Sequence, residues 1–195
     1  MILLGIPTMG TIPIKVFASV VKVVRKYGDD VSIMTTANSL VYNARNELAM
    51  DAHNNGCDLV FLDSDIEFST EAFTQLISHK KPIVSGLYWT RSSPSTPVAY
   101  KRVAPKTLFR DKPIAEPISE IQPFMEVEGA GMGFCIIRHE VLRELYKTYD
   151  NPFQPFGNMG EDFSFFYRAR KKGFKVDLDT TLGLKHLGEY AYGRG

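Results

Sequence analysis

Apolar runs of strand length alternate with segments of helical periodicity through residues 1–88, and this alternation restricts the fold more than any other feature. The apolar runs lie at residues 1–6, 31–35, 59–62 and 83–88. Helical segments lie between them at residues 14–27, 40–52 and 70–77, and Ser69 or Thr70 suits the N-terminal cap of the last. Parallel strands need such crossover helices, so we predict an α/β fold whose parallel sheet is covered by helices on both faces.

The composition of the chain changes after residue 91, where proline becomes frequent. Six prolines fall between Ser92 and Pro123, which indicates a long ordered insertion rather than a linker. Further strands are predicted at residues 133–138, 175–178 and 182–186, and further helices at 139–146 and 161–172. A chain of 195 residues fits one domain, so we interpret residues 1–195 as a single domain with halves at 1–91 and 92–195.

The charge balance does not favour a nucleic-acid partner. Lys and Arg number 23 against 22 Asp and Glu, so the formal net charge is only +1. A chain without an overall basic field has little to attract a phosphate backbone. The most basic stretch, Arg168 to Lys172, is typical of the C-terminal turn of a helix.

Cysteine usage and hydropathy bear on the compartment. Cys57 and Cys135 are the only cysteines, and residues 1–7 lack the features of a secretory signal. We therefore expect a soluble, cytoplasmic protein. No apolar run approaches the ~20 residues that cross a bilayer, so any membrane contact is expected to be peripheral. The sequence leaves the oligomeric state open.

Two carboxylates, in Asp63-Ser64-Asp65, directly follow the apolar run 59–62. Open α/β sheets bind ligands at the carboxyl ends of their strands, which is where this segment falls. Carboxylate oxygens hold Mg²⁺ or Mn²⁺ and leave coordination positions for phosphate oxygens. Acids after a strand also make turns or cap the next helix, so the segment alone is a weak indication of a metal.

His186 follows the last predicted strand. A lone histidine at a strand end is ordinarily a hydrogen-bonded polar group with no further role. Combined with Asp65 and Asp63, it would complete a metal site, and an imidazole ligand favours Mn²⁺ over Mg²⁺.

Glu161 and Asp162 open a predicted helix directly after Gly160. Acids in a first helical turn complement the helix dipole, which is a sufficient structural reason for them. The same position suits a base that accepts a proton from an attacking hydroxyl. In the functional interpretation Asp162 is the base and Glu161 positions the acceptor.

The glycines of Gly129-Ala-Gly131-Met-Gly133 lead into a strand. Phosphate-binding glycine loops open a helix instead, so we reject a dinucleotide-binding interpretation. The small residues predict either close approach of the backbone to a ligand or an ordinary turn.

Three further features have two interpretations each. Arg45, on the second helix, suits a phosphate contact or a surface salt bridge. Trp89 suits stacking on a sugar or base, or simple packing. Asp177 and Asp179 form a second acid pair, but we assign them to a turn and leave them out of the site.

Taken in order, these segments resemble the metal-dependent glycosyltransferases of the GT-A fold, especially the inverting family 2 and its small viral and microbial relatives. The resemblance covers nearly the whole chain and implies a mixed sheet flanked by helices. The matching segments are Ile6-Pro-Thr8, Ala44-Arg-Asn46, Asp63-Ser-Asp65, Gly129-Ala-Gly131, Gly160-Glu-Asp162, Arg168-Ala-Arg170 and His186-Leu-Gly188.

The resemblance implies a role for each half of the chain. Residues 1–91 would bind the nucleotide and residues 92–195 the acceptor. The implied nucleotide and donor residues are Pro7, Thr8, Arg45, Asp63, Ser64, Asp65 and Gly131. The implied acceptor-side residues are Trp89, Met159 and Gly160, next to the base Asp162. The implied metal ligands are Asp65, Asp63 and His186.

The implied activity is transfer of a monosaccharide from a UDP- or GDP-linked sugar to a glycan, glycoprotein or lipid acceptor. The second strand ends in Met34-Thr35-Thr36, without the acid that many relatives place near the nucleotide base, so the base stays open. Retaining families carry similar motifs, so inversion is an expectation from the resemblance alone.

Two other functions are compatible with the sequence. A sugar-nucleotide nucleotidyltransferase would share the α/β sheet and the metal, but Gly5-Ile-Pro-Thr-Met-Gly10 lacks the basic residues expected of its N-terminal loop. A non-catalytic carbohydrate- or nucleotide-binding module would share the fold, and the intact acids and His186 argue against it.

Overall fold

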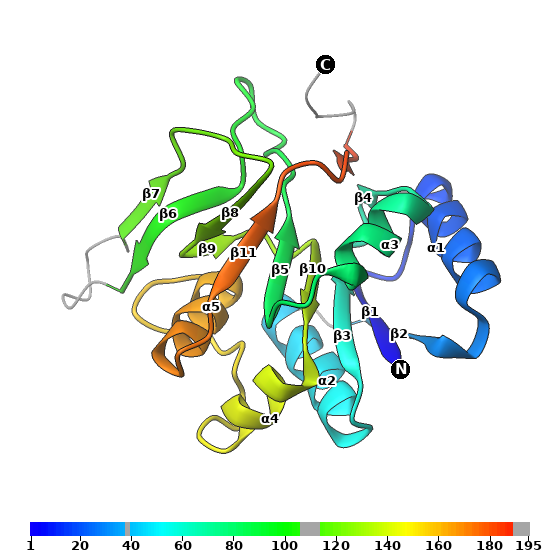
Figure 1. Cartoon of the computed structure of the whole chain (residues 1–195), viewed down its shortest axis with the longest axis horizontal. Helices are drawn as coiled ribbons and strands as arrows, with labels where there is room; N and C mark the ends of the chain where they lie inside the picture. The colour runs from blue at the N-terminus through cyan, green and yellow to red at the C-terminus, as the bar shows by residue number, and fades with distance from the viewer. Residues whose placement is uncertain (38–39, 106–113, 189–195) are drawn as a thin grey trace.

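A seven-stranded mixed sheet forms the centre of the computed structural model, which describes residues 1–37, 40–105 and 114–188 (Figure 1). The strand order is β2-β1-β3-β10-β5-β11-β8. In that order the strands are Val31–Ala37, Ile2–Thr8, Asp58–Leu62, Phe134–Ile137, Ile83–Gly86, Val176–Asp179 and Phe124–Val127. Both halves of the chain contribute strands to this one sheet.

The sheet is mixed rather than parallel, which corrects the expectation from the first 88 residues. β1 pairs in parallel with β2 and β3, as the alternation predicts. The fourth run, β5, does not lie next to β3, because β10 inserts antiparallel between them. β11 restores a parallel pairing with β5, and β8 closes the edge antiparallel to β11. The mixed sheet agrees with the fold that the family resemblance implies.

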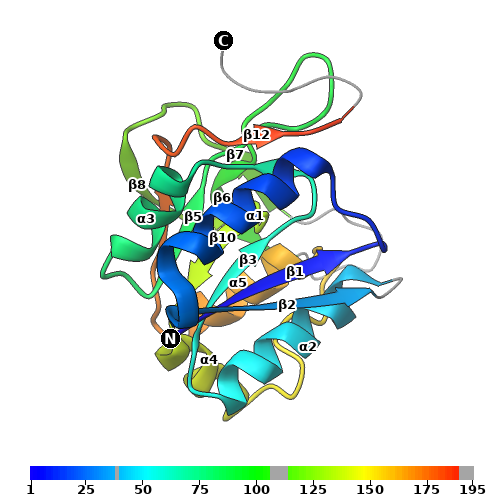
Figure 2. The same cartoon turned by 90° about the vertical axis from the view of Figure 1, so that its right-hand side faces the viewer.

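Helices cover both faces of the sheet. One face packs against α1 (Ile14–Tyr27) and α3 (Thr70–Ser78), and the other against α2 (Val41–Asn54), α4 (His139–Tyr146) and α5 (Glu161–Lys171). Figure 2 shows α1 and α2 on opposite sides of β1 and β2. A short 3₁₀ turn, η1 (Gly28–Asp30), follows α1. Ser69 caps α3, since its side chain accepts a hydrogen bond from Ala72 N at 3.0 Å.

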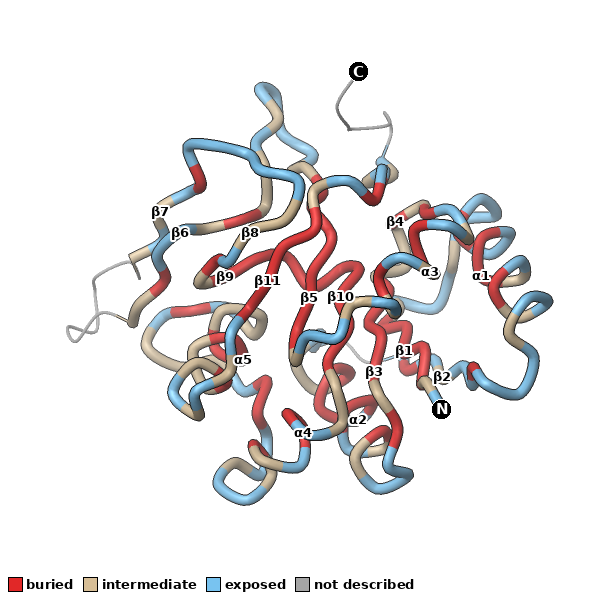
Figure 3. The backbone as a smooth tube through the Cα atoms, in the orientation of Figure 1, coloured by how far each residue is buried: buried red, intermediate tan, exposed pale blue. Residues whose placement is uncertain are grey.

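The residues of β3 explain the two-sided core. Leu59 and Phe61 pack into the layer with α2, α4 and α5, whereas Val60 and Leu62 pack into the layer with α1 and α3. All four are fully buried, because side chains of a strand alternate between faces and both faces are covered (Figure 3). β3 therefore leads from the middle of the core straight to Asp63.

The Pro-rich insertion contributes two strands, β6 and β7, to a small antiparallel sheet beside the main one. Its order is β7-β6-β9, with β7 at Ile114–Pro117, β6 at Ala99–Ala104 and β9 at Gly129–Ala130. Residues 106–113 of the predicted insertion lie outside the described part of the chain. β9 leads through Gly131 to β10, so the small sheet borders the carboxyl edge of the main sheet (Figure 1).

A two-stranded ladder joins the end of the chain to the segment after β3. β12 (Lys185–His186) pairs antiparallel with β4 (Ile66–Glu67), so the predicted strand at 182–186 is only two residues long. The amide of Leu187 also donates to the Asp65 carbonyl at 2.7 Å. Within residues 1–37, 40–105 and 114–188, no helix has both the length and the hydropathy to cross a membrane.

Candidate active site at the carboxyl edge of the sheet

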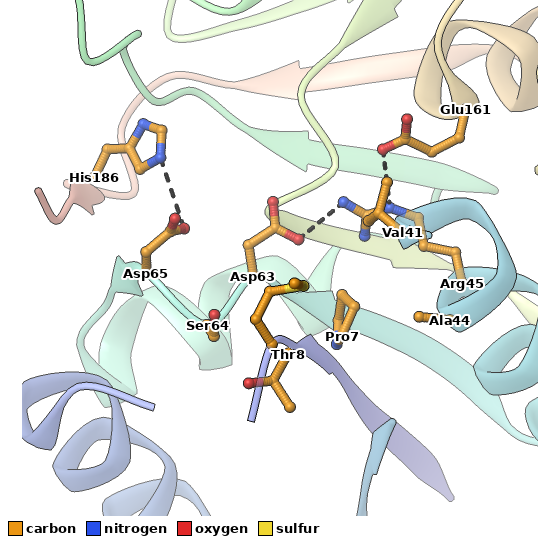
Figure 4. A pocket seen from close by; sticks show the side chains of 11 residues that line it. Pro7, Thr8, Val41, Ala44, Arg45, Asp63, Ser64, Asp65, Glu161 and His186 are labelled. Atoms are coloured by element: carbon orange, nitrogen blue, oxygen red, sulfur yellow. Dashed lines mark hydrogen bonds and ion pairs between the residues drawn. The ribbon is translucent and has the colours of Figure 1, made fainter. Parts of the chain in front are cut away.

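A cavity of about 340 Å³ opens where β1 and β3 end, between the start of α2 and the start of α5 (Figure 4). Its volume is within the range of small-molecule sites. It is lined by Pro7, Thr8, Met9, Val41, Ala44, Arg45, Asp63, Ser64, Asp65, Glu161 and His186. Eight of these come from the sequence-predicted site. Met9, Val41 and Ala44 were not predicted, since isolated apolar residues carry no local signal of a ligand.

Arg45 and Asp63 form the central ion pair of the cavity. Arg45 Nη2 donates to Asp63 Oδ1 at 2.8 Å, and Arg45 Nε lies 3.5 Å from Glu161 Oε1 (Figure 4). The Arg45 side chain is only 4% exposed, so its charge depends on these two carboxylates. Burial opposes that charge, but attraction by Asp63 and Glu161 raises the pKa of Arg45 above its usual value. Arg45 therefore forms the salt bridge that the sequence allowed, but in a buried position rather than on the surface.

One nitrogen of Arg45 remains unused. Nη1 is buried and has no hydrogen-bond partner among the described residues. Buried donors are almost always paired in folded proteins, so an unpaired one beside a cavity is a reason to look for a ligand there.

Asp65 and His186 face each other on the other side of the cavity (Figure 4). His186 Nε2 lies 3.6 Å from Asp65 Oδ1, and His186 Nδ1 lies 2.8 Å from the carbonyl oxygen of Trp89. A carbonyl oxygen can only accept a hydrogen bond, so Nδ1 must carry the ring proton. Nε2 then carries the lone pair. Burial lowers the pKa of His186, and the charge of Arg91 acts in the same direction. The imidazole is therefore neutral at pH 7, the form that ligates metals.

The three predicted metal ligands do not converge on one point. Asp63 turns toward Arg45, and only Asp65 and His186 face each other. Among residues 1–37, 40–105 and 114–188, no three His, Cys, Asp or Glu side chains are grouped closely enough to hold a metal ion. Of the three predicted metal ligands, only Asp65 and His186 are therefore placed to bind one ion in this structure.

Arg91 is a site residue that the sequence did not reveal. Its guanidinium forms an ion pair with the Asp65 carboxylate, and its Nε donates to His186 Nε2 at 2.9 Å. It follows Trp89 and Thr90 in the loop between β5 and β6, where no periodicity or spacing marks it. Only the pairing of β12 with β4 brings its partners within reach.

Asp162 lies in the first turn of α5. Its Oδ1 accepts a hydrogen bond from Phe163 N at 2.7 Å, within the turn that the dipole argument predicts. Burial and the adjacent charge of Glu161 nevertheless raise the pKa of Asp162 to about 7. Glu161 lines the cavity, whereas Asp162 is not among the lining residues. Burial raises the pKa of Tyr100 of β6, and the charge of Asp162 acts in the same direction.

Gly131 and Gly133 leave space for the side chain of Tyr88. A Cβ on Gly131 would come within 2.1 Å of the Tyr88 hydroxyl, and Gly133 N donates to that hydroxyl at 3.2 Å. Tyr88 is buried and fills the space beside both glycines. The predicted close contact with the backbone therefore exists, but the Tyr88 side chain makes it rather than a ligand. The donor contact of Gly131 stays a prediction.

The remaining predicted residues also take part in local structure. Trp89 holds His186 through its carbonyl, Gly160 is the N-cap residue of α5, and the Met159 side chain is buried. A buried Met159 does not face an acceptor. Asp177 and Asp179 lie within β11 and are buried, so their assignment to an edge turn is wrong. Asp179 accepts hydrogen bonds from Thr181, Gln75 and His79.

Comparison with known proteins identifies the fold. No family model matches the sequence, and no curated protein matches it either. A solved structure of A197 from STIV matches with a TM-score of 0.67 at 20% identity, over 96% of this chain and 85% of that one. A structure of GalNAc-T7 with UDP, GalNAc and Mn²⁺ matches with a TM-score of 0.60 at 15% identity, over 91% of this chain.

These likenesses establish a GT-A-type glycosyltransferase fold for the chain, which confirms the predicted fold class. At such identities they establish the fold alone. The chain spans 42% of the length of the GalNAc-T7 chain.

Proposed function

We propose that the protein transfers a monosaccharide from a nucleoside-diphosphate sugar to an acceptor hydroxyl, with a divalent cation in the site. The observation that carries this proposal is the pairing of Asp65 with His186 beside a cavity lined by Arg45. The GT-A-type fold supports it, because a fold raises the expectation of an activity that its site can perform.

The two candidate metal ligands suit Mn²⁺ better than Mg²⁺. Asp65 offers a hard carboxylate oxygen and His186 a neutral nitrogen, a mixture that favours Mn²⁺. Sites of this kind hold the cation by one or two carboxylates plus substrate phosphates, so two protein ligands are enough to begin a site. The cation would offset the negative charge of the departing diphosphate.

The nucleotide would occupy the cavity between β1 and α2. Pro7, Thr8, Met9 and Val41 supply apolar contacts there, and Arg45 supplies its unused Nη1 donor. A guanidinium held by two carboxylates cannot rotate freely, so it presents this donor in a fixed direction. Within residues 31–37, β2 carries no acid that could select the base, so both UDP- and GDP-linked sugars are candidate donors.

Asp162 would act as the general base. A carboxylate with a pKa of about 7 is matched to proton abstraction near neutral pH. It would accept the proton of the acceptor hydroxyl as that oxygen attacks the anomeric carbon and the bond to the diphosphate breaks. Attack from the face opposite the diphosphate inverts the configuration, as in family 2. Glu161, Gly131, Gly160 and Trp89 would border the donor sugar and the acceptor.

A release assay tests this function. The protein is incubated with UDP- and GDP-linked sugars and simple glycoside acceptors, and the free nucleoside diphosphate is measured with Mn²⁺ or with chelator. Mn²⁺-dependent release that Asp162→Asn abolishes, while nucleotide binding persists, is the expected result. Equal release by both proteins would remove Asp162 from the role of base. Nucleotide binding without release from any donor would instead point to a non-catalytic binding module.

A further inference from the structure

The Arg91 guanidinium occupies the position between Asp65 and His186 that a cation would take. It contacts the Asp65 carboxylate and also donates from Nε to His186 Nε2 at 2.9 Å. We propose that Arg91 exchanges partners: it neutralises Asp65 while no metal is bound, and it binds the donor diphosphate once a metal has taken Asp65 and His186. This inference rests on the proposed function and adds a donor-binding residue to it.

A metal ion and the Arg91 guanidinium cannot both bind His186 Nε2. The Nδ1 proton is committed to the Trp89 carbonyl at 2.8 Å, so Nε2 carries the ring's one available lone pair. Arg91 already uses that lone pair through its Nε hydrogen. A metal ion and Arg91 therefore cannot both bind His186, and one must leave when the other arrives.

Arg91 can leave at little cost. Its side chain is 42% exposed, and an ion pair at such exposure contributes little net stability. The loop that carries it is held by its own backbone, since Thr90 N donates to Thr96 O and Val98 N donates to Tyr88 O, both at 2.9 Å. The side chain can therefore rotate away while the loop stays in place.

The released guanidinium has a suitable new partner in a diphosphate. Trp89, two residues away, remains bound to His186, so Arg91 stays beside the metal position after it leaves. A guanidinium pairs with phosphate oxygens through two parallel hydrogen bonds. Arg45, the cation on the opposite side of the cavity, is already held by Asp63 and Glu161. Arg91 would thus contact the diphosphate from the metal side.

The exchange couples the metal to the donor. In the metal-free protein Arg91 lowers the affinity of the site for the metal. When donor is present, the diphosphate holds Arg91 away from Asp65 and removes this competition. Each ligand therefore strengthens the binding of the other, and by linkage the two factors are equal.

Calorimetric titration of the full chain tests the exchange. Mn²⁺ is titrated without nucleotide, and UDP and GDP are titrated with saturating Mn²⁺ and with chelator, for the wild type, Arg91→Ala and Arg91→Lys. The control is Arg102→Ala, which removes the same charge from an exposed ion pair with Glu116 on β6 and β7. Circular dichroism and melting temperature verify that each variant is folded.

The exchange predicts opposite changes in the two affinities. Arg91→Ala should bind Mn²⁺ roughly two- to fivefold more tightly than the wild type, because a competing partly exposed ion pair is lost. The same variant should bind the nucleotide about tenfold or more weakly in Mn²⁺, because a charge-assisted bond to phosphate is lost. Arg91→Lys should lie between, and Arg102→Ala should match the wild type.

Other outcomes separate the two proposals. Unchanged or weaker Mn²⁺ binding by Arg91→Ala, in a protein whose wild type binds metal and nucleotide, overturns the exchange and leaves the proposed function standing. Wild-type nucleotide binding that is equal in Mn²⁺ and in chelator, and lost in Arg91→Ala, overturns the exchange because Arg91 would then replace the metal. Absence of both metal and nucleotide binding in all variants overturns the proposed function together with the exchange.

Discussion

His186 Nε2 lies 3.6 Å from Asp65 Oδ1, although the two residues belong to segments that are far apart in the sequence. The pairing of β12 with β4 brings them together, and the Leu187 amide reinforces it by donating to the Asp65 carbonyl at 2.7 Å. A backbone ladder, rather than a flexible loop, thus sets this distance. The arrangement suits a metal site, because ligands on rigid elements are held more precisely.

Replacement of His186 should change metal selectivity. His186→Ala removes the nitrogen ligand and leaves carboxylate oxygen, so we expect Mn²⁺ affinity to fall about 10- to 100-fold and Mg²⁺ affinity to fall less. Titration of both ions measures the difference. His79→Ala is the matched control, because His79 pairs with Asp179 outside the cavity. Unchanged affinity for both ions would show that His186 is not a ligand.

Replacement of Arg45 should destabilise the protein. Arg45→Met leaves Asp63 and Glu161 without their shared partner, and loss of one member of a buried ion pair costs about 3 kcal/mol or more. Urea unfolding measures this cost. Adding Asp63→Asn to Arg45→Met should recover part of it, since one uncompensated charge disappears. Additive losses in the double variant would mean that the two residues are not energetically coupled.

The activity should depend on the ionisation of Asp162. Because the pKa of Asp162 is about 7 and the base must be deprotonated, transfer should rise as the pH increases through about 7 and then level off. A pH profile of nucleoside diphosphate release checks this. A profile that is flat between pH 5.5 and about 8.5 would assign the base to another group.

The raised pKa of Asp162 should also make the folding stability depend on pH. The pKa of Asp162 is raised in the folded state, so folding favours the protonated form, and stability is lost as the pH rises from about 4 toward 7. Asp162→Asn cannot ionise and escapes this loss. Its melting temperature should therefore exceed that of the wild type at pH 8, and the difference should shrink at pH 5. The opposite trend would contradict the raised pKa.

Gly131 should not tolerate a side chain. Gly131→Ala places a methyl group within 2.1 Å of the Tyr88 hydroxyl, and overpacking of this kind costs roughly 1–3 kcal/mol. The double variant with Tyr88→Leu should lose less than the sum of the two single losses, because the smaller side chain makes room. Thermal or urea unfolding of the three variants measures this, and simple additivity would show that the two positions do not interact.

Local patterns were sufficient to predict most of the elements. The strands β1, β2 and β3, the capped helix α3 and the acidic start of α5 all follow from periodicity and end signals in short windows. Asp63 and Asp65 were placed correctly because β3 is an uninterrupted apolar run that ends at them. The carboxyl edge of the sheet was therefore predictable from the sequence.

The errors concern contacts between distant parts of the chain. The antiparallel insertion of β10 between β3 and β5 depends on pairings of residues some 50 or 70 positions apart, which no local window records. Arg91 was missed for the same reason, because its partners come from two other segments. Met159 was assigned to the acceptor side from its place in a loop, but that loop turns its side chain inward.

Titration of UDP and GDP into the purified protein, with Mn²⁺ and with chelator, tests the proposed function most directly when Asp65→Ala is run beside the wild type. Glu116→Ala serves as the control, since it removes an exposed carboxylate of β7. We predict that one of the two nucleotides binds only with Mn²⁺, and that Asp65→Ala alone loses this binding. Absence of binding for both nucleotides, or equal binding in Asp65→Ala and with chelator, would contradict a metal-assisted nucleotide-sugar site.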